Sequence, residues 1–280
     1  MNNGIKIGVI ISTYNNPEWL EKTLWGYSVQ TRPADEIIIA DDGSTEETKQ
    51  LIDSFRELLP IKHVWHEDNG FLKTIISNKA IVAAESEYLI FTDQDCVPRC
   101  DFIETHEMHA EKGYYLSGRG FRLSLELSEK ITKDDIISGR AFKFLWLLKN
   151  GMVKEKMNSP QFSLKPKYSL TNYLNYLATK SPLWNGGNAS GWREDILRVN
   201  GYDNNMLYGK EDTELGKRLL NSGLKSKLIR YSAVTFHLEH KRPYKNLEIL
   251  EKNKTRCEEV ERLGIVETPN GIKELDKIKF

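Results

Sequence analysis

Three stretches decide the fold: IKIGVIIS at residues 5–12, EIIIADDGS at residues 36–44 and EYLIFTDQD at residues 87–95. Each is a short run of β-branched and aromatic residues that ends abruptly in polar ones, as a buried strand does. A fourth run with this composition, KHVWH, occupies residues 62–66. The first third of the chain therefore contains four predicted strands.

Stretches with helical spacing separate these strands, at residues 17–30, 45–58 and 73–84. Asn16 and Pro17 are typical of a helix N-terminus, where a side chain caps the first turn and proline is tolerated. Strands that alternate with helices at this pitch predict an α/β fold. Its central sheet should be mostly parallel, with helices on both faces.

Polar side chains gather where three of these strands end. In open α/β sheets, ligands bind beyond the carboxyl ends of the strands. We therefore expect one site to collect Thr13, Tyr14 and Asn15, then Asp41 and Asp42, then Asp93, Gln94 and Asp95. Neither GxGxxG nor GxxxxGK[ST] follows any strand, which disfavours dinucleotide-binding and P-loop proteins.

Composition narrows the class of protein. The 280 residues carry 40 Lys+Arg against 40 Asp+Glu, with 39% hydrophobic residues, as in a soluble globular protein. Zero net charge disfavours a nucleic-acid-coating protein. Apolar runs are far shorter than the about 20 residues that cross a bilayer, and no signal peptide is visible. Three cysteines, an odd number, suit free thiols. We predict a cytoplasmic protein without a nucleic-acid partner.

The alternation of strands and helices stops near residue 122. Residues 139–180 carry eight basic residues and one acid, interleaved with aromatic and leucine side chains such as Phe142, Phe144 and Trp146. We divide the chain into a ligand-binding half at 1–122, a helical basic insert at 123–183, a second half of the same domain at 184–245 and a charged, partly helical tail at 246–280.

Two acidic motifs at strand ends have a functional and a structural interpretation. Asp93 and Asp95 flank one residue and could hold a hard divalent cation, or they could lie in a solvated turn. Asp41 and Asp42 could accept hydrogen bonds from a base or ribose. Alternatively, the segment could start a helix that Ser44 caps.

Three motifs in the second half are also chemically suggestive. Glu211-Asp212 opens a helical stretch ending at Gly223, so these acids either complement the helix dipole or supply a general base. His237 and His240 could both ligate a metal, or one could pack. The Gly186-Gly187-Asn188 turn permits close approach of its backbone to a ligand, or is an ordinary turn.

The order of these motifs along the chain resembles the family 2 nucleotide-sugar glycosyltransferases of GT-A fold, which is Rossmann-like. Residues 9–95 resemble the nucleotide-binding half of that family. Residues 184–240 resemble the galactosyltransferase-type acceptor half of chondroitin-synthase-like enzymes. The chain departs from the family at residues 206–210, where MLYGK replaces a tryptophan-rich run, and in the insert at 124–183.

The resemblance implies a role for each matched position. The donor nucleotide would contact Thr13, Tyr14 and Asn15 at the base, with Asp41 on the uracil and Asp42 beside it. Asp93 and Gln94 would contact the ribose, and Lys73 would contact the diphosphate. Gly186, Gly187 and Asn188 would contact the donor sugar. The implied metal ligands for Mn²⁺ or Mg²⁺ are Asp95, Asp93 and His237, with His240 as the alternative histidine. Asp212 is the implied base, and Glu211 and Trp184 contact the acceptor.

These roles imply an inverting, metal-dependent transferase that moves a sugar from a UDP-sugar to a surface polysaccharide or lipid-linked oligosaccharide. A sugar-phosphate nucleotidyltransferase is the nearest rival, but it would need a glycine-rich, basic loop where this chain has STYNN at residues 12–16. A non-catalytic carbohydrate-binding protein is the other alternative. The basic insert is either a solvated helical segment or a peripheral contact with an anionic membrane.

Overall fold

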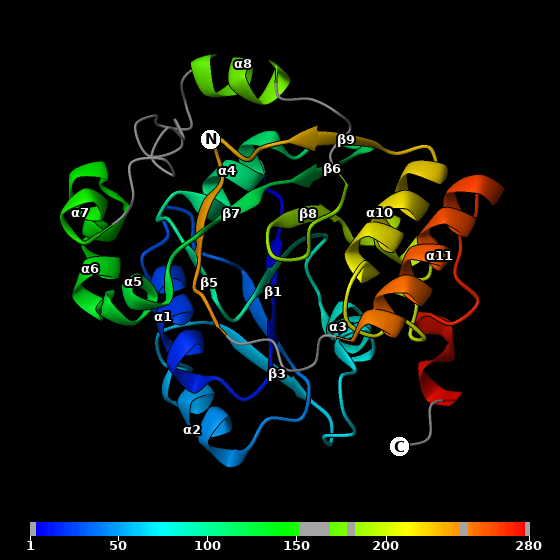
Figure 1. Ribbon diagram of the computed structural model, residues 1–280, viewed down its shortest axis with the longest axis horizontal. Helices are drawn as coiled ribbons and strands as arrows, with labels where there is room; N and C mark the ends of the chain where they lie inside the picture. The colour runs from blue at the N-terminus through cyan, green and yellow to red at the C-terminus, as the bar shows by residue number, and fades with distance from the viewer. Residues whose placement is uncertain (1–3, 152–168, 178–182, 241–245, 278–280) are drawn as a thin grey trace.

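The computed structural model describes residues 4–151, 169–177, 183–240 and 246–277, and its centre is a seven-stranded sheet (Figure 1). The strands are β1 (Ile7–Thr13), β2 (Glu36–Asp41), β3 (Ile61–Trp65), β4 (Tyr88–Asp93), β6 (Tyr114–Ser117), β8 (Ala189–Trp192) and β9 (Lys225–Leu228). Their order in space is β3-β2-β1-β4-β8-β6-β9. Of the seven, β8 alone runs antiparallel to its neighbours, so the predicted mostly parallel sheet is confirmed.

Helices cover both faces of this sheet, as predicted. One face packs on α1 (Pro17–Ser28), α2 (Glu46–Ser54) and α4 (Phe102–His109); the other packs on α3 (Lys73–Ala83), α9 (Arg193–Arg198) and α10 (Glu211–Asn221). Strand β1 shows why both faces are covered. Val9 and Ile11 point into the first apolar cluster and Ile10 into the second, and all three are fully buried.

The two predicted helix caps have different outcomes. Asn16 caps α1, because its side chain accepts a hydrogen bond from the Trp19 amide. The prediction for Ser44 is wrong. Thr45 occupies the N-cap position of α2 and makes no capping hydrogen bond, whereas the Ser44 hydroxyl accepts a hydrogen bond from the Asn15 amide. Ser44 therefore fixes the loop after β1 and leaves α2 uncapped.

A second, three-stranded sheet brings the C-terminal half to the DQD motif. It has the order β5 (Cys96–Pro98), β10 (Val234–His237), β7 (Arg119–Arg122). His237 lies opposite Cys96 in the antiparallel pair, and the Leu238 amide donates to the Asp95 carbonyl. Residues more than 140 positions apart in sequence are thereby held side by side.

The insert is helical where it is described. It contains α5 (Leu125–Lys130), α6 (Lys133–Ile137), the 3₁₀ turn η1 (Arg140–Phe142), α7 (Phe144–Lys149) and α8 (Ser169–Leu177). Phe142, which the membrane interpretation would need at the surface, is buried, and its ring stacks on Phe236 with centroids 4.3 Å apart. Arg140 pairs with Asp135. Five of the other bases lie outside the described residues: Lys154, Lys156, Lys165, Lys167 and Lys180.

The predicted helical tail is α11 (Leu247–Leu263), followed by the 3₁₀ segment η4 (Ile272–Lys277). Helix α11 runs beside α10 at one edge of the molecule (Figure 1). All three cysteines are free thiols. Among the described residues, no helix combines the length and apolar character needed to span a bilayer.

Candidate active site

The carboxyl ends of β1, β2 and β4 meet at one cavity of about 1140 Å³. Its walls include Thr13, Tyr14, Asn15, Asp42, Lys73, Asp93, Gln94, Asp95, Glu211, Asp212, His237 and His240. The predicted convergence of the strand ends is therefore confirmed. The cavity also collects the Glu211-Asp212 pair and both histidines, which come from the other half of the chain.

The loop after β1 forms one wall of the cavity, and Gln94 holds it in place. The Gln94 side chain accepts a hydrogen bond from the Tyr14 amide at 3.0 Å and donates one to the Tyr14 carbonyl at 2.9 Å. The Tyr14 hydroxyl donates to Asp68 at 2.9 Å. Thr13 Oγ1 is buried without a hydrogen-bond partner among the described residues. This wall can therefore offer an aromatic ring and a hydroxyl to a ligand.

Asp41 and Asp42 are each paired with a histidine: Asp41 with the half-buried His63 and Asp42 with the buried His66. Asp41 accepts from the Ser44 amide and lies 2.8 Å from His63 Nε2; it is fully buried and does not line the cavity. The expected contact of Asp41 with the base is thus not what the structure shows. Asp42 lines the cavity, lies 2.7 Å from His66 Nε2 and accepts from the Leu72 amide. Burial raises the pKa of Asp42 above its usual value.

Lys73 lies at the centre of the acidic part of the cavity. Its ammonium is 2.6 Å from Asp93 Oδ1. Burial alone would lower the pKa of Lys73, but the charges of Asp93, Asp212 and Glu211 outweigh that effect and hold the pKa well above its ordinary value. Lys73 therefore stays charged, and it is the cation that makes three close carboxylates tolerable.

The Glu211-Asp212 pair opens α10, as predicted, and its two acids differ. Burial, with a contribution from Asp93, raises the pKa of Asp212, while Lys73 and the Tyr202 hydroxyl oppose the shift. Tyr202 donates to Asp212 Oδ1 at 3.2 Å. Burial and the charge of Asp212 raise the pKa of Glu211 to about 7. Asp212 is thus oriented by a fixed donor, whereas Glu211 carries a large cost of ionisation.

That cost predicts a stabilising substitution in the site. The folded state holds the Glu211 proton up to about pH 7, whereas the unfolded chain releases it near 4.5, so stability falls as pH rises between these values. Glu211→Gln should remove this loss. The change that it causes in the free energy of unfolding should therefore be about 3 kcal/mol more favourable at pH 8 than at pH 4.

Urea unfolding of both proteins at pH 4 and pH 8 checks this expectation. Glu258→Gln, which removes an exposed carboxylate of α11 outside the cavity, is the control for the substitution itself. A Glu211→Gln effect that is the same at both pH values would contradict the raised pKa.

Asp95 and the two histidines form a possible metal site. Asp95 Oδ2 is 2.9 Å from His240 Nε2 and 3.6 Å from His237 Nε2. Burial would raise the pKa of Asp95, but the hydrogen bond from His240 and the charge of His237 outweigh it, and the pKa is lowered. One carboxylate and two imidazoles whose ligand atoms lie within 4.8 Å of one another can ligate a divalent cation of the first transition series. Both histidines face Asp95, so neither is excluded as a ligand.

The turn at Gly186 and Gly187 approaches acids rather than open space. A Cβ atom on Gly186 would lie 2.3 Å from Asp212 Oδ1, so only glycine fits there. Asn188, expected at the donor sugar, is instead fully buried: its amide donates to the Ala233 carbonyl and its oxygen contacts His106. The turn therefore shapes the site by packing against Asp212 and Asp93.

Trp184 also differs from expectation. Only 2% of its surface is exposed, and its ring packs between Phe91 and Tyr115. Its indole N–H donates to the Tyr202 hydroxyl, which in turn donates to Asp212. Trp184 lines the cavity wall, but most of its ring is held in the core and its indole N–H holds the Tyr202 hydroxyl, so its contact with an acceptor stays a prediction.

Comparison with known proteins places the chain in a family. The sequence profile described as "Glycosyl transferase family 2" matches residues 8–154, more than half of the chain. The chain belongs to glycosyl transferase family 2. The profile described as "N-terminal domain of galactosyltransferase" matches residues 169–242. The two profiles together cover most of the insert at 124–183, where the motifs alone showed no resemblance to the family.

A sequence relative agrees with this family, and solved structures share the fold of the chain. The chondroitin synthase of Escherichia coli is 26% identical over 240 residues, 83% of this chain; the chain spans 34% of that protein's length. Staphylococcus aureus TarS in complex with UDP-GlcNAc superposes with a TM-score of 0.56 at 14% identity, covering 90% of this chain and 66% of that one. The mannosyltransferase of Pyrobaculum calidifontis, in complex with GDP-Man and Mn²⁺, gives 0.55 at 18% identity, covering 86% and 59%.

Several residues of this family 2 site were not identified from the sequence. Tyr202, Tyr208 and Lys210 lie beside the Glu211-Asp212 pair or line the cavity with it. His63 and His66 hold the acids after β2. His63 follows Asp41 by 22 residues and lies on the adjacent strand β3, and His66 follows Asp42 by 24 residues, directly after that strand. The KHVWH run therefore contained the signal, but only strand pairing reveals it.

Proposed function

We propose that this family 2 protein transfers a sugar from a UDP-sugar to a hydroxyl group of a glycan, with inversion at the anomeric carbon. The observation that carries the proposal is the placement of Asp212. Its carboxylate is half-buried, held by Tyr202 and Gly186, and shares one cavity with the Asp95 site and Lys73. A general base and a positively charged subsite for a diphosphate therefore lie in the same cavity.

In this proposal the residues divide between donor binding and catalysis. Thr13, Tyr14, Asn15, Asp42 and Gln94 would form the nucleoside end of the cavity. Lys73 would balance the diphosphate charge. A divalent cation held by Asp95, His237 and His240, with Asp93 nearby, would supply further positive charge to the leaving diphosphate.

Asp212 would take the proton of the acceptor hydroxyl as its oxygen bonds to the anomeric carbon. The carbon–oxygen bond to the diphosphate breaks on the opposite side, and UDP leaves with the electron pair, so one displacement inverts the configuration. Glu211, which is protonated up to about pH 7, could donate a hydrogen bond to the acceptor.

The acceptor class rests on relatives that make polysaccharides, such as the chondroitin synthase. UDP release tests the enzyme proposal: the chain should release UDP from at least one UDP-sugar when Mn²⁺ or Mg²⁺ is present, and release none after EDTA treatment. A carbohydrate-binding protein would release no UDP under either condition, and a nucleotidyltransferase would release pyrophosphate from UTP and a sugar phosphate.

We also propose that the insert meets an anionic membrane that carries a lipid-linked acceptor. Leu145 on α7 is 76% exposed, next to the exposed Phe144 and the bases Lys143 and Lys149. Such a face should co-sediment with anionic vesicles and lose binding as salt rises, because exposed charges are screened within roughly 8 Å at physiological ionic strength. Equal sedimentation with neutral vesicles, or none with either, would contradict it.

A further inference from the structure

Helix α11 begins at Leu247, after the residues that the two family profiles match. One face of this helix is turned to the loop that precedes the Glu211-Asp212 pair. Leu250, Asn253 and Cys257 lie at i, i+3 and i+7 and so share that face. Asn253 and Cys257 are buried, and Leu250 reaches the cavity wall. An element outside the recognised family regions therefore borders the site.

Asn253 makes the densest contact between α11 and this loop. Its side-chain nitrogen donates to the Gly209 carbonyl at 2.7 Å and to the Leu207 carbonyl at 3.1 Å, with the Tyr208 carbonyl at 3.4 Å. The residue is 2% exposed. Its side-chain amide thus lies within hydrogen-bonding distance of the carbonyls of three consecutive residues. Because this amide is buried, the carbonyls would lose a donor if it were removed.

The loop that Asn253 holds has an unusual backbone. Gly209 has φ +97° and Lys210 has φ +73°, and Lys210 is the N-cap of α10 although its side chain makes no capping bond. A left-handed conformation at a non-glycine residue persists only where the surroundings impose it. Cys257 Sγ lies 3.6 Å from the Lys210 carbonyl, and Leu250 leaves no room for a Cβ at Gly209. The conformation at 209–210 sets the direction in which Glu211 and Asp212 leave the loop.

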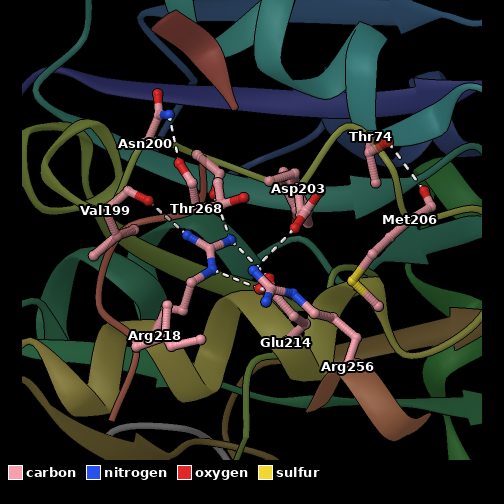
Figure 2. A network of polar contacts seen from close by, with 12 residues as sticks. Thr74, Val199, Asn200, Asp203, Met206, Glu214, Arg218, Arg256 and Thr268 are labelled. Carbon is pink, nitrogen blue, oxygen red and sulfur yellow. Dashed lines mark hydrogen bonds and ion pairs between the residues drawn. The ribbon is translucent and has the colours of Figure 1, made fainter. Parts of the chain in front are cut away.

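A second contact anchors the other end of the same loop. Arg256 lies 3.2 Å from Asp203 Oδ2 and 3.8 Å from Glu214 Oε1, and Figure 2 shows it inserted between the two acids. Glu214 is in turn paired with the fully buried Arg218, which donates to the carbonyls of Val199 and Gly201. Segment 203–214 is thereby held from α11 at both ends.

We propose that α11 is a positioning element of the active site and that Asn253 is its main positioning residue. Asn253 holds residues 207–210 in the conformation that aims Glu211 and Asp212 into the cavity. The kinetic consequence rests on the proposed function. Without the Asn253 amide, three carbonyls lose their donor, Lys210 relaxes toward negative φ, and the first turn of α10 no longer presents Asp212 to an acceptor. Donor binding should be retained, because Asn253 makes no contact with the nucleoside end of the cavity, which is built on β1, β2 and β4.

The test compares Asn253→Ala with Asn221→Ala. Asn221 has the same chemistry at the same helix pair: its amide donates to the carbonyls of Val260 and Ile265, far along α10 from the loop. Both variants should lose stability. Only Asn253→Ala should lower kcat for UDP release, at least tenfold, with the donor KM unchanged within twofold. Asn253→Leu, which keeps the side-chain shape and removes the amide, should reproduce the loss if the alanine variant fails to fold.

Hydrogen–deuterium exchange gives a readout that does not depend on activity. Amides of residues 207–214 should exchange faster in Asn253→Ala or Asn253→Leu than in Asn221→Ala or the wild type. A kcat equal to that of Asn221→Ala, or unchanged exchange at 207–214, would overturn the proposal for α11. If the wild type itself releases no UDP, the proposed function fails, and the exchange result still decides whether α11 orders the loop.

Discussion

Asp212→Asn is expected to lower the rate of sugar transfer by about 10²- to 10⁴-fold while leaving UDP-sugar affinity nearly unchanged, because it removes the proposed general base. Asparagine conserves the shape of the side chain and can still accept the Tyr202 hydrogen bond. The substitution removes a carboxylate that must be ionised to act as a base. Since burial raises the pKa of Asp212, the wild-type rate should fall as pH drops through that raised value.

Initial rates at saturating donor, together with calorimetric titration of UDP, measure the two quantities separately. Asp195→Asn is the matched control: Asp195 is also buried and paired, on α9, but outside the cavity. It should transfer at the wild-type rate. An Asp212→Asn variant that also transfers at that rate would place the base elsewhere, and Glu211 would be the next candidate.

Asp95→Ala is expected to abolish the metal-dependent part of UDP binding. Asp95 is the carboxylate that both His237 and His240 face, and its removal takes away the anionic ligand. Substitution of outer residues in metal sites already costs about 10- to 100-fold in affinity, so the loss of a direct ligand should cost at least as much. Calorimetry of UDP with and without Mn²⁺ measures the effect.

The control for Asp95→Ala is Asp101→Ala. Asp101 lies six residues after Asp95, outside the cavity, and is paired with Arg99. It should bind UDP and Mn²⁺ like the wild type. Unchanged affinity in Asp95→Ala would eliminate the proposed metal site, whereas a partial loss would mean that Asp93, His237 and His240 retain the cation.

The N-terminal strands could be predicted because they are buried on both faces, as Val9, Ile10 and Ile11 illustrate. Strand β8 could not be predicted: its sequence, ASGW, has no β-branched residue, and its place between β4 and β6 depends on partners far away in the chain. The residues before His237 suit a strand, but the pairing of β10 with β5, which brings His237 to Asp95, could not be predicted either.

The acids of the site were visible in the sequence because they follow predicted strands or open a predicted helix. Their supports were not visible. Tyr202 belongs to the GYD sequence at residues 201–203, but nothing in that sequence shows that its hydroxyl reaches Asp212. Asn253 belongs to a segment without a motif, because a face formed by Leu250, Asn253 and Cys257 is too mixed in polarity to stand out as a buried stripe. Trp184 and Asn188 were assigned to ligand contacts by resemblance; both are buried, and of the two only Trp184 lines the cavity.

The anomeric configuration of the first product tests the central proposal most directly. Turnover of an α-linked UDP-sugar with water as acceptor, followed by ¹H NMR before mutarotation, reports which face of the anomeric carbon is attacked. The β-anomer should form first, only with Mn²⁺ or Mg²⁺ present, and at a strongly reduced rate in Asp212→Asn. Initial formation of the α-anomer, or no turnover of any UDP-sugar with either cation, would contradict an inverting, metal-dependent transfer with Asp212 as the base.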